Sequence, residues 1–217
     1  MKRCLAVLVL LWAALTSGAR ADLPAYGEVM QWLADFGAAL DGLEVLNHPE
    51  RTLDPSRQDG LLYQYAFGFV RAKGNESPYP DAVSEIILCT PDVVDPRDAY
   101  VGMTPEEAGL MLPERETWTD LYVTEFSAED KGYCWLYGEP GTPGAAEWTA
   151  LGTGGETVPF YRLTYAFDTQ GKIVEIRLKL GSVAPEEARD AMRVAEELIR
   201  RQTAEGTGAA EEATGDE

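Results

Sequence analysis

Few side chains in this sequence could carry acid–base or covalent chemistry. The single histidine, His48, stands in a turn before Pro49, and one loop imidazole is more typical of a surface residue than of a catalytic base. The same scarcity argues against histidine-rich zinc sites. The glycine-rich segment 152–155 is not a nucleotide-binding loop, because no strand leads into it and no helix follows it. We therefore expect no cofactor and no enzymatic activity.

Three aspartates could bind a cation. Asp92, Asp95 and Asp98 lie in one proline-containing loop and offer oxygen ligands that calcium accepts. Their spacing is not that of an EF-hand, and turn or cap roles explain aspartates in such a loop equally well. A calcium-stabilised structural protein is therefore one alternative function. Another is an extracellular hydrolase or carbohydrate-active enzyme that uses carboxylates of the region 138–158.

An alternating set of aromatic residues is the main candidate for a binding surface. Tyr133, Trp135 and Tyr137 alternate with Cys134 and Leu136, and successive side chains of a strand point to opposite faces. If Cys134 and Leu136 face the core, the three aromatics lie together on the surface, and such a patch marks a binding site. The opposite arrangement stays open, because burial is the usual state of aromatic side chains.

The first 21 residues are typical of a secretion signal. Lys2 and Arg3 precede an apolar run at 5–15, which is too short to span a membrane. The small residues of Ala19-Arg20-Ala21 suit a signal peptidase. We expect cleavage after Ala21, no membrane span in the mature chain, and a location outside the cytoplasm.

The charge of the chain limits its partners. The formal net charge of −19 becomes −22 once Lys2, Arg3 and Arg20 are removed with the signal. Nucleic acid and anionic lipid are poor partners for such a surface, because both are bound through Lys and Arg. An extracellular or envelope protein is the expected partner.

Two cysteines, Cys89 and Cys134, remain when Cys4 is removed with the signal. An even pair in an oxidising compartment is a candidate disulfide. Two reduced thiols that pack as small apolar side chains are the alternative, because the sequence gives no distance between the two cysteines.

Hydrophobic periodicity predicts the elements that position these residues. Spacings of three and four predict a helix over 26–42 and another over 185–202, and a capping box of Thr104 and Glu107 predicts a short helix over 104–112. Alternating residues predict strands at 61–71, 82–90, 121–126, 131–138, 160–168 and 172–180. The Gly- and Pro-rich region 138–158 is predicted to be a mobile loop, and the tail 204–217 to be disordered.

The order of these elements predicts an α+β fold, with an antiparallel sheet that has helices on one face. Helix, strands, helix, strands, helix also suggests two degenerate helix-plus-meander repeats. The predicted parts are a signal peptide at 1–21, an N-terminal half at 22–100, a C-terminal half at 101–203 and an acidic tail at 204–217.

Two segments, YVGMTPEEAGLMLP and LTYAFDTQGKIVEIRL, carry a resemblance to a known group. They resemble the helix-then-meander unit of the superfamily of β-lactamase inhibitory proteins and SmpA/OmlA-type envelope proteins of bacteria. Gly102, Met103, Thr104, Glu106 and Glu107 match the helix opening, and about half of the mature chain is covered. The sequence departs from the group in its long region 138–158 and in lacking a lipid-attachment cysteine after cleavage.

The resemblance implies a module that binds other proteins, and it does not identify the partner. Together with the residues above, it leads to the expectation of a secreted, non-enzymatic protein-binding or inhibitory module. Its expected contact surface is formed by Tyr133, Trp135 and Tyr137.

Overall fold

Over the residues that it describes, the computed structural model contains one antiparallel sheet and two helices. It describes residues 24–40, 42–46, 61–73, 83–110, 112, 122–125, 132–138 and 141–212, with only the backbone for 122–125, 199 and 202–212. The predicted signal peptide and His48 lie outside these residues.

The elements follow one another as a helix, eight strands and a helix. In chain order they are α2 (Tyr26–Leu40), β1 (Leu61–Tyr65), β2 (Gly68–Ala72), β3 (Val83–Leu88), β4 (Tyr122–Glu125), β5 (Gly132–Tyr137), β6 (Gly144–Leu151), β7 (Val158–Phe167), β8 (Ile173–Val183) and α3 (Pro185–Glu212). The α+β class and the antiparallel sheet are thereby confirmed, whereas the two repeats stay a prediction.

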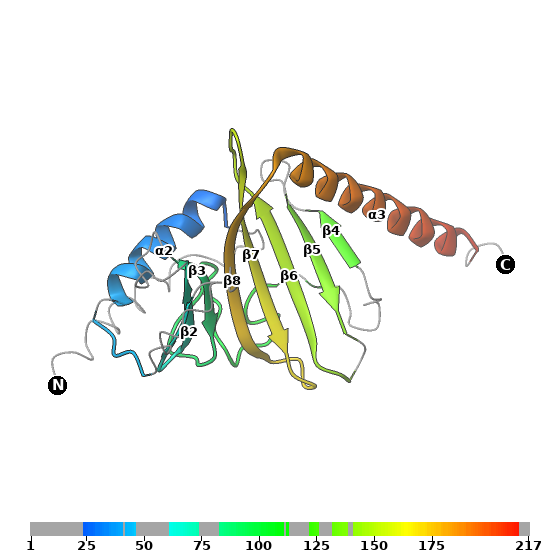
Figure 1. Ribbon diagram of the computed structural model, residues 1–217. Helices are drawn as coiled ribbons and strands as arrows, with labels where there is room; N and C mark the ends of the chain where they lie inside the picture. The colour runs from blue at the N-terminus through cyan, green and yellow to red at the C-terminus, as the bar shows by residue number, and fades with distance from the viewer. Residues whose placement is uncertain are drawn as a thin grey trace.

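The last strand joins the two halves of the chain. The strand order is β1-β2-β3-β8-β7-β6-β5-β4, and every neighbouring pair is antiparallel. β8 therefore lies between β3 from the first half and β7 from the second (Figure 1). Both halves share one continuous sheet.

One face of this sheet, here called the core face, is built around β7. Tyr161, Leu163, Tyr165 and Phe167 alternate along the strand and are almost fully buried. The helix α2 covers them at one end, where the Tyr161 hydroxyl donates a hydrogen bond of 2.5 Å to the backbone oxygen of Pro24. Further along β7 the covering segment is 90–112, whose Asp95 accepts a hydrogen bond from the Tyr165 hydroxyl.

The predicted strand 61–71 is two strands in the structure. β1 and β2 form a hairpin whose turn is Ala66-Phe67, and Gly68 follows with φ of +145°. A Cβ at Gly68 would lie 2.0 Å from the backbone oxygen of Ile87. Glycine is required where a backbone approaches so closely, and it allows the turn that divides the run.

The predicted helix at 104–112 is not an α-helix, although its capping box is present. The Thr104 amide donates to the Glu107 carboxylate at 2.8 Å, and the Glu107 amide donates to the Thr104 hydroxyl at 3.3 Å. Gly109 then adopts a left-handed φ of 64°. The segment closes about one turn and ends, because a left-handed residue terminates a helix.

The region 138–158, predicted to be a mobile loop, contains the strand β6, which lies between β7 and β5. Its alternating residues Ala146, Trp148 and Ala150 are buried on the core face. The Gly and Pro content suggested a loop, but this alternation fits a strand that is buried on one side.

The tail, predicted to be disordered from 204, continues α3 to Glu212. The alanines and glutamates of this stretch are strong helix formers, whereas Gly206 and Gly208 disfavour a helix. Near its beginning, α3 buries Ala188 and Ala195 and lies beside β4 and β5, at the side of the sheet away from α2 (Figure 1). Among the described residues, no helix is both long and apolar enough to pass through a membrane.

Candidate functional site

The second face of the sheet, here called the outer face, is formed by the side chains that alternate with those of the core face. Along β7 these include Arg162 and Thr164, which lie between buried residues. The register places Thr149 and then Tyr133 beside Arg162, and Glu147 and then Trp135 beside Thr164. Aromatic side chains of β5 and charged side chains of the middle strands therefore share this face.

The three predicted aromatic residues lie on the outer face. Cys134 and Leu136 are fully buried, whereas Tyr133 and Trp135 are partly exposed and Tyr137 is 42% exposed. The rings of Tyr133 and Trp135 meet edge to face, with centroids 5.9 Å apart and planes at 84°. The arrangement that the sequence left open is thus the outward one. Burial, and secondly the charge of Glu147, raise the pKa of Tyr137.

A second set of contacts lies beside these aromatics, on β6 and β7. Nε of Arg162 lies 3.3 Å from Glu147 Oε1 and donates a hydrogen bond of 3.3 Å to the Thr149 hydroxyl. The Thr164 hydroxyl donates to Glu147 at 3.4 Å. The Arg162 guanidinium also lies over the Phe160 ring, 5.8 Å from its centroid. Arg162 is therefore oriented by groups from two strands.

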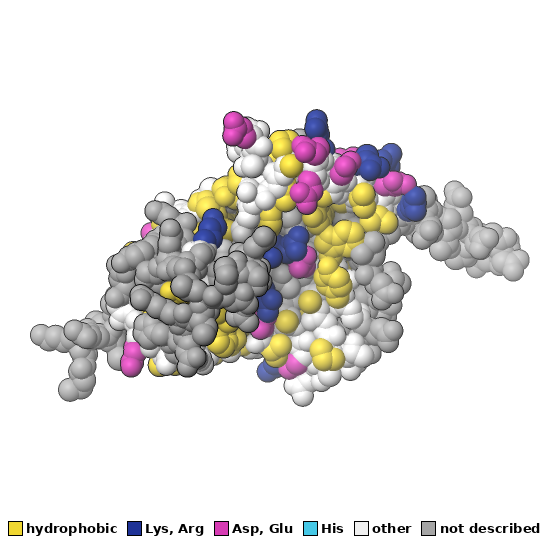
Figure 2. Space-filling view, in the orientation of Figure 1, with side chains coloured by type: hydrophobic (Ala, Val, Ile, Leu, Met, Phe, Trp, Pro, Cys, Tyr) yellow, Lys and Arg dark blue, Asp and Glu magenta, His cyan; other side chains and the backbone are white. Residues whose placement is uncertain are grey.

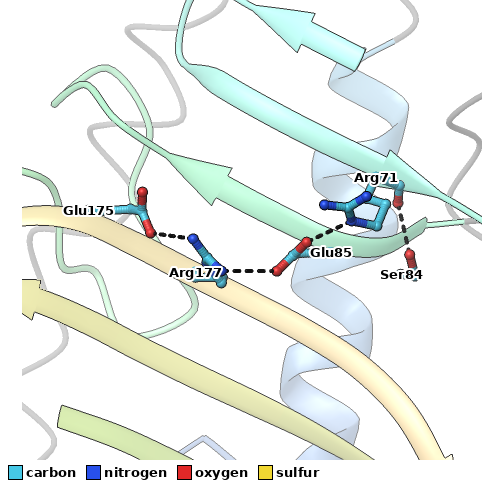
Figure 3. A network of polar contacts seen from close by, with 5 residues as sticks. All are labelled: Arg71, Ser84, Glu85, Glu175 and Arg177. Carbon is cyan, nitrogen blue, oxygen red and sulfur yellow. Dashed lines mark hydrogen bonds and ion pairs between the residues drawn. The ribbon is translucent and has the colours of Figure 1, made fainter. Parts of the chain in front are cut away.

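A third set crosses β2, β3 and β8 (Figure 3). Glu85 accepts a hydrogen bond of 2.8 Å from Arg71 Nε, and Nη1 of Arg177 lies 3.6 Å from its other oxygen. Arg177 Nη2 also donates to Glu175 at 2.8 Å. The Glu85 side chain is only 9% exposed, while that of Arg177 is 44% exposed. In Figure 3 the helix α2 runs behind these strands, so the network lies on the opposite side from α2.

Charged and apolar side chains occupy neighbouring parts of the molecular surface. Figure 2 shows side chains of both charges over the middle of the sheet, with apolar side chains beside them toward β5 and α3. Sequence reasoning found the aromatic part and missed the charged part. The available signal was the single charged residues that alternate with apolar ones in the strands, such as Glu85, Arg162 and Arg177.

The three aspartates are not gathered into one cluster in the structure. Asp95 is buried, and its Oδ1 accepts hydrogen bonds from the Arg97 and Ala99 amides at 2.8 and 2.9 Å, while its Oδ2 accepts one from Tyr165. Asp92 accepts a hydrogen bond from Thr90, and Asp98 has a left-handed φ of 64°. Over the described ranges, no three acidic, His or Cys side chains are placed to hold a metal ion. Asp92 and Asp95 instead accept local hydrogen bonds within the loop, as expected for aspartates in turns.

The predicted disulfide between Cys89 and Cys134 does not form in the structure. Both thiols are free, with Cys89 exposed and Cys134 buried. Cys89 follows β3 and Cys134 lies in β5, and three strands stand between β3 and β5. At roughly 4.8 Å a strand spacing this separates them by about 19 Å, far beyond the Cα distance that a disulfide spans. Burial raises the pKa of the Cys134 thiol well above its ordinary value.

The described side chains of the outer face offer aromatic and charged contacts to a partner surface. Glu147, a carboxylate of the region 138–158, is held by Arg162 and Thr164. The buried pair of Asp95 and Tyr165 lies in the core, where both carboxylate oxygens are engaged. Aromatic rings and guanidinium groups are instead the residue types that dominate protein–protein contacts.

No protein-family model, curated protein or solved structure matches this chain. The resemblance to the β-lactamase inhibitory proteins and the SmpA/OmlA-type envelope proteins therefore stays a prediction.

Proposed function

We propose that this protein is a secreted, non-enzymatic module that binds or inhibits another protein through the outer face of its sheet. The contact surface is centred on Tyr133, Trp135 and Tyr137. The partner is an extracellular or envelope protein. The helix-plus-meander repeats and the relation to the inhibitory proteins belong to the same proposal.

One observation carries the proposal: the three aromatics of β5 point away from the core. Their neighbours Cys134 and Leu136 fill the core side, so the fold does not need the aromatics to complete its core. Trp and Tyr are enriched in the residues that contribute most to binding, and exposed groups of them mark interaction surfaces. Arginine is the third residue type that is enriched in such binding sites, and Arg162 and Arg177 lie on the same face.

The location outside the cytoplasm depends on the predicted signal at 1–21. It is tested by expressing the full chain in a bacterium and determining the N-terminal sequence of the protein outside the cytoplasm. We expect the exported chain to begin at Asp22. An intact N-terminus in the cytoplasmic fraction would overturn this part of the proposal.

The binding surface is tested by affinity capture with the chain from Asp22 onward. The variants Trp135→Ala and Tyr137→Ala are compared with Tyr100→Ala, whose side chain is 38% exposed against 42% for Tyr137. Far-UV circular dichroism and thermal unfolding establish that each variant is folded.

We expect one extracellular protein to be captured by the unchanged chain and by Tyr100→Ala, and lost from both β5 variants. Capture that survives in both folded β5 variants would place the binding surface elsewhere.

A further inference from the structure

The guanidinium groups of the outer face are already oriented before any partner binds. Arg71 contacts Glu85 through its Nε (Figure 3). Arg162 contacts Glu147 and Thr149 through its Nε as well. Nε is the inner nitrogen, so in these two arginines the contacts fix the plane of the group while the outer nitrogens Nη1 and Nη2 lie beyond them. Arg177 is held differently, because its Nη1 lies 3.6 Å from Glu85 and its Nη2 donates to Glu175 at 2.8 Å. Guanidinium groups held in this way lose little entropy when they bind an anion.

These groups also stay accessible. The side chains of Arg71, Arg162 and Arg177 are 28%, 36% and 44% exposed, whereas the side chain of Glu85, which holds two of them, is 9% exposed. Glu85 and Glu147, at 9% and 20%, thus lie further inward than the arginines that they hold, whereas Glu175 is 34% exposed. A ligand that approaches this face therefore meets N–H donors first.

Across the neighbouring strands β2, β3, β8, β7 and β6, the described outer-face side chains carry more positive than negative charge. Four cations, Arg71, Arg162, Arg177 and Lys179, stand against the three glutamates Glu85, Glu147 and Glu175. The whole chain has a net charge of −19. The counted part of this face thus has a net charge of +1, opposite in sign to that of the whole chain.

The cationic and aromatic parts are close enough for one ligand to contact both. Arg162 lies opposite Thr149, and Thr149 lies opposite Tyr133. Two strand spacings correspond to about 10 Å. Thr149, the residue between them, is small and buried, and its hydroxyl accepts a hydrogen bond from Arg162.

We propose that the partner presents an acidic, apolar protein segment to this face, with a carboxylate on the guanidinium group of Arg162, beside the positive charge of Arg177, and an apolar side chain on Trp135 and Tyr137. The proposal rests on the function proposed above and adds the chemistry of the partner. Carboxylates match the planar guanidinium with two parallel hydrogen bonds. A dense polyanion such as a sulfated polysaccharide fits less well, because the negative charge of the whole chain repels its many charges more strongly than it repels one or two carboxylates.

The test uses two probes with the chain from Asp22 onward: a random-peptide phage library, and heparin as a sulfated polysaccharide. Peptides selected on the unchanged chain are synthesised and their Kd is measured for four variants. Arg162→Lys keeps the charge and removes the planar group, and Arg177→Gln removes a charge. Trp135→Ala tests the aromatic part. Arg193→Gln, on the exposed side of α3, is the matched control for a lost charge.

We expect selected peptides that combine Asp or Glu with large apolar residues. Their Kd is expected to rise about tenfold in Arg162→Lys, Arg177→Gln and Trp135→Ala, and to stay unchanged in Arg193→Gln. Salt is expected to weaken binding to the unchanged chain.

Each of the other outcomes would overturn a different part of the proposal. Peptides without acids that depend on Trp135 and not on the arginines would leave the proposed binding function standing and overturn its acidic partner. Heparin binding that depends on the arginines, without acidic peptides, would replace the protein segment by a polyanion. Selection that depends on neither Trp135 nor the arginines would overturn both this inference and the proposed function.

Discussion

The hydroxyl of Tyr165 on β7 donates a hydrogen bond to the carboxylate of Asp95, which lies in the segment covering the core face. Burial raises the pKa of Asp95 to about 6 from an ordinary value of 3.8, although the hydrogen bonds from Tyr165, Ala99 and Arg97 oppose this effect. The covering segment is therefore anchored by a carboxyl group whose charge is costly in the folded state.

This pair predicts that the protein is more stable in mild acid. Between pH 3.8 and about 6 the folded state binds a proton on Asp95 that the unfolded chain has released. The contribution of Asp95 to the free energy of unfolding therefore falls as pH rises through this window, by up to about 3 kcal/mol. Urea unfolding at a series of pH values measures it.

The variant Asp95→Asn isolates this contribution, because an amide cannot ionise. We expect its pH dependence to lack the fall between pH 4 and 6, while Asp35→Asn, on the exposed side of α2, keeps it. The same fall in Asp95→Asn would show that another group causes it.

The close approach at Gly68 predicts a large effect of a single methyl group. Gly68→Ala places a Cβ 2.0 Å from the Ile87 backbone oxygen at a φ of +145°, so β2 and β3 must separate there. We expect a loss of about 3 kcal/mol or more in the free energy of unfolding. Gly155→Ala is the control, since its Cβ would meet nothing within 4 Å, and is expected to stay within about 0.5 kcal/mol. Equal stability of the two variants would contradict the pairing at Gly68.

Glu85 predicts a coupling between the two arginines it contacts. Glu85→Gln weakens the contacts to Arg71 and Arg177 and is expected to lower the free energy of unfolding by about 1 kcal/mol. A double-mutant cycle with Arg71→Gln is expected to show non-additivity, whereas one with Arg193→Gln is not. Additive losses with Arg71→Gln would argue against a shared network.

The free cysteines predict two different reactivities. In the chain from Asp22 onward, one thiol, Cys89, is expected to react with a thiol reagent in the native protein, because it is exposed. Cys134 is expected to react only in denaturant, since it is fully buried. Burial and the nearby Glu175 also raise the pKa of Cys89, so its reaction is expected to accelerate above neutral pH. A native protein without any reactive thiol, whose thiols appear only after reduction, would instead indicate a disulfide.

The sequence was sufficient for the parts of the fold that depend on local periodicity. The hairpin of β7 and β8 follows from two alternating runs around a turn, and α2 follows from its spacings of three and four. The capping box of Thr104 and Glu107 was predicted too, but the length of the segment depended on Gly109, whose left-handed φ is a structural property.

What the sequence could not supply was the order of strands in space. The insertion of β8 between β3 and β7 separates Cys89 from Cys134 and brings Arg71, Glu85 and Arg177 into one row. No local pattern encodes such pairings between distant segments. The direction of the β5 aromatics could not be predicted either. Alternation shows that Tyr133 and Cys134 point to opposite faces, but it does not show which of them faces the core.

The most direct test of the binding surface is site-specific photo-crosslinking in the producing organism. A photoreactive phenylalanine analogue is placed at Tyr137 in one chain and at Tyr100 in another, two positions of similar exposure at 42% and 38%. The outer-face account predicts a crosslinked protein at position 137 and none at position 100. A crosslink at position 100 alone, or none at position 137 while the folded protein is exported, would contradict it.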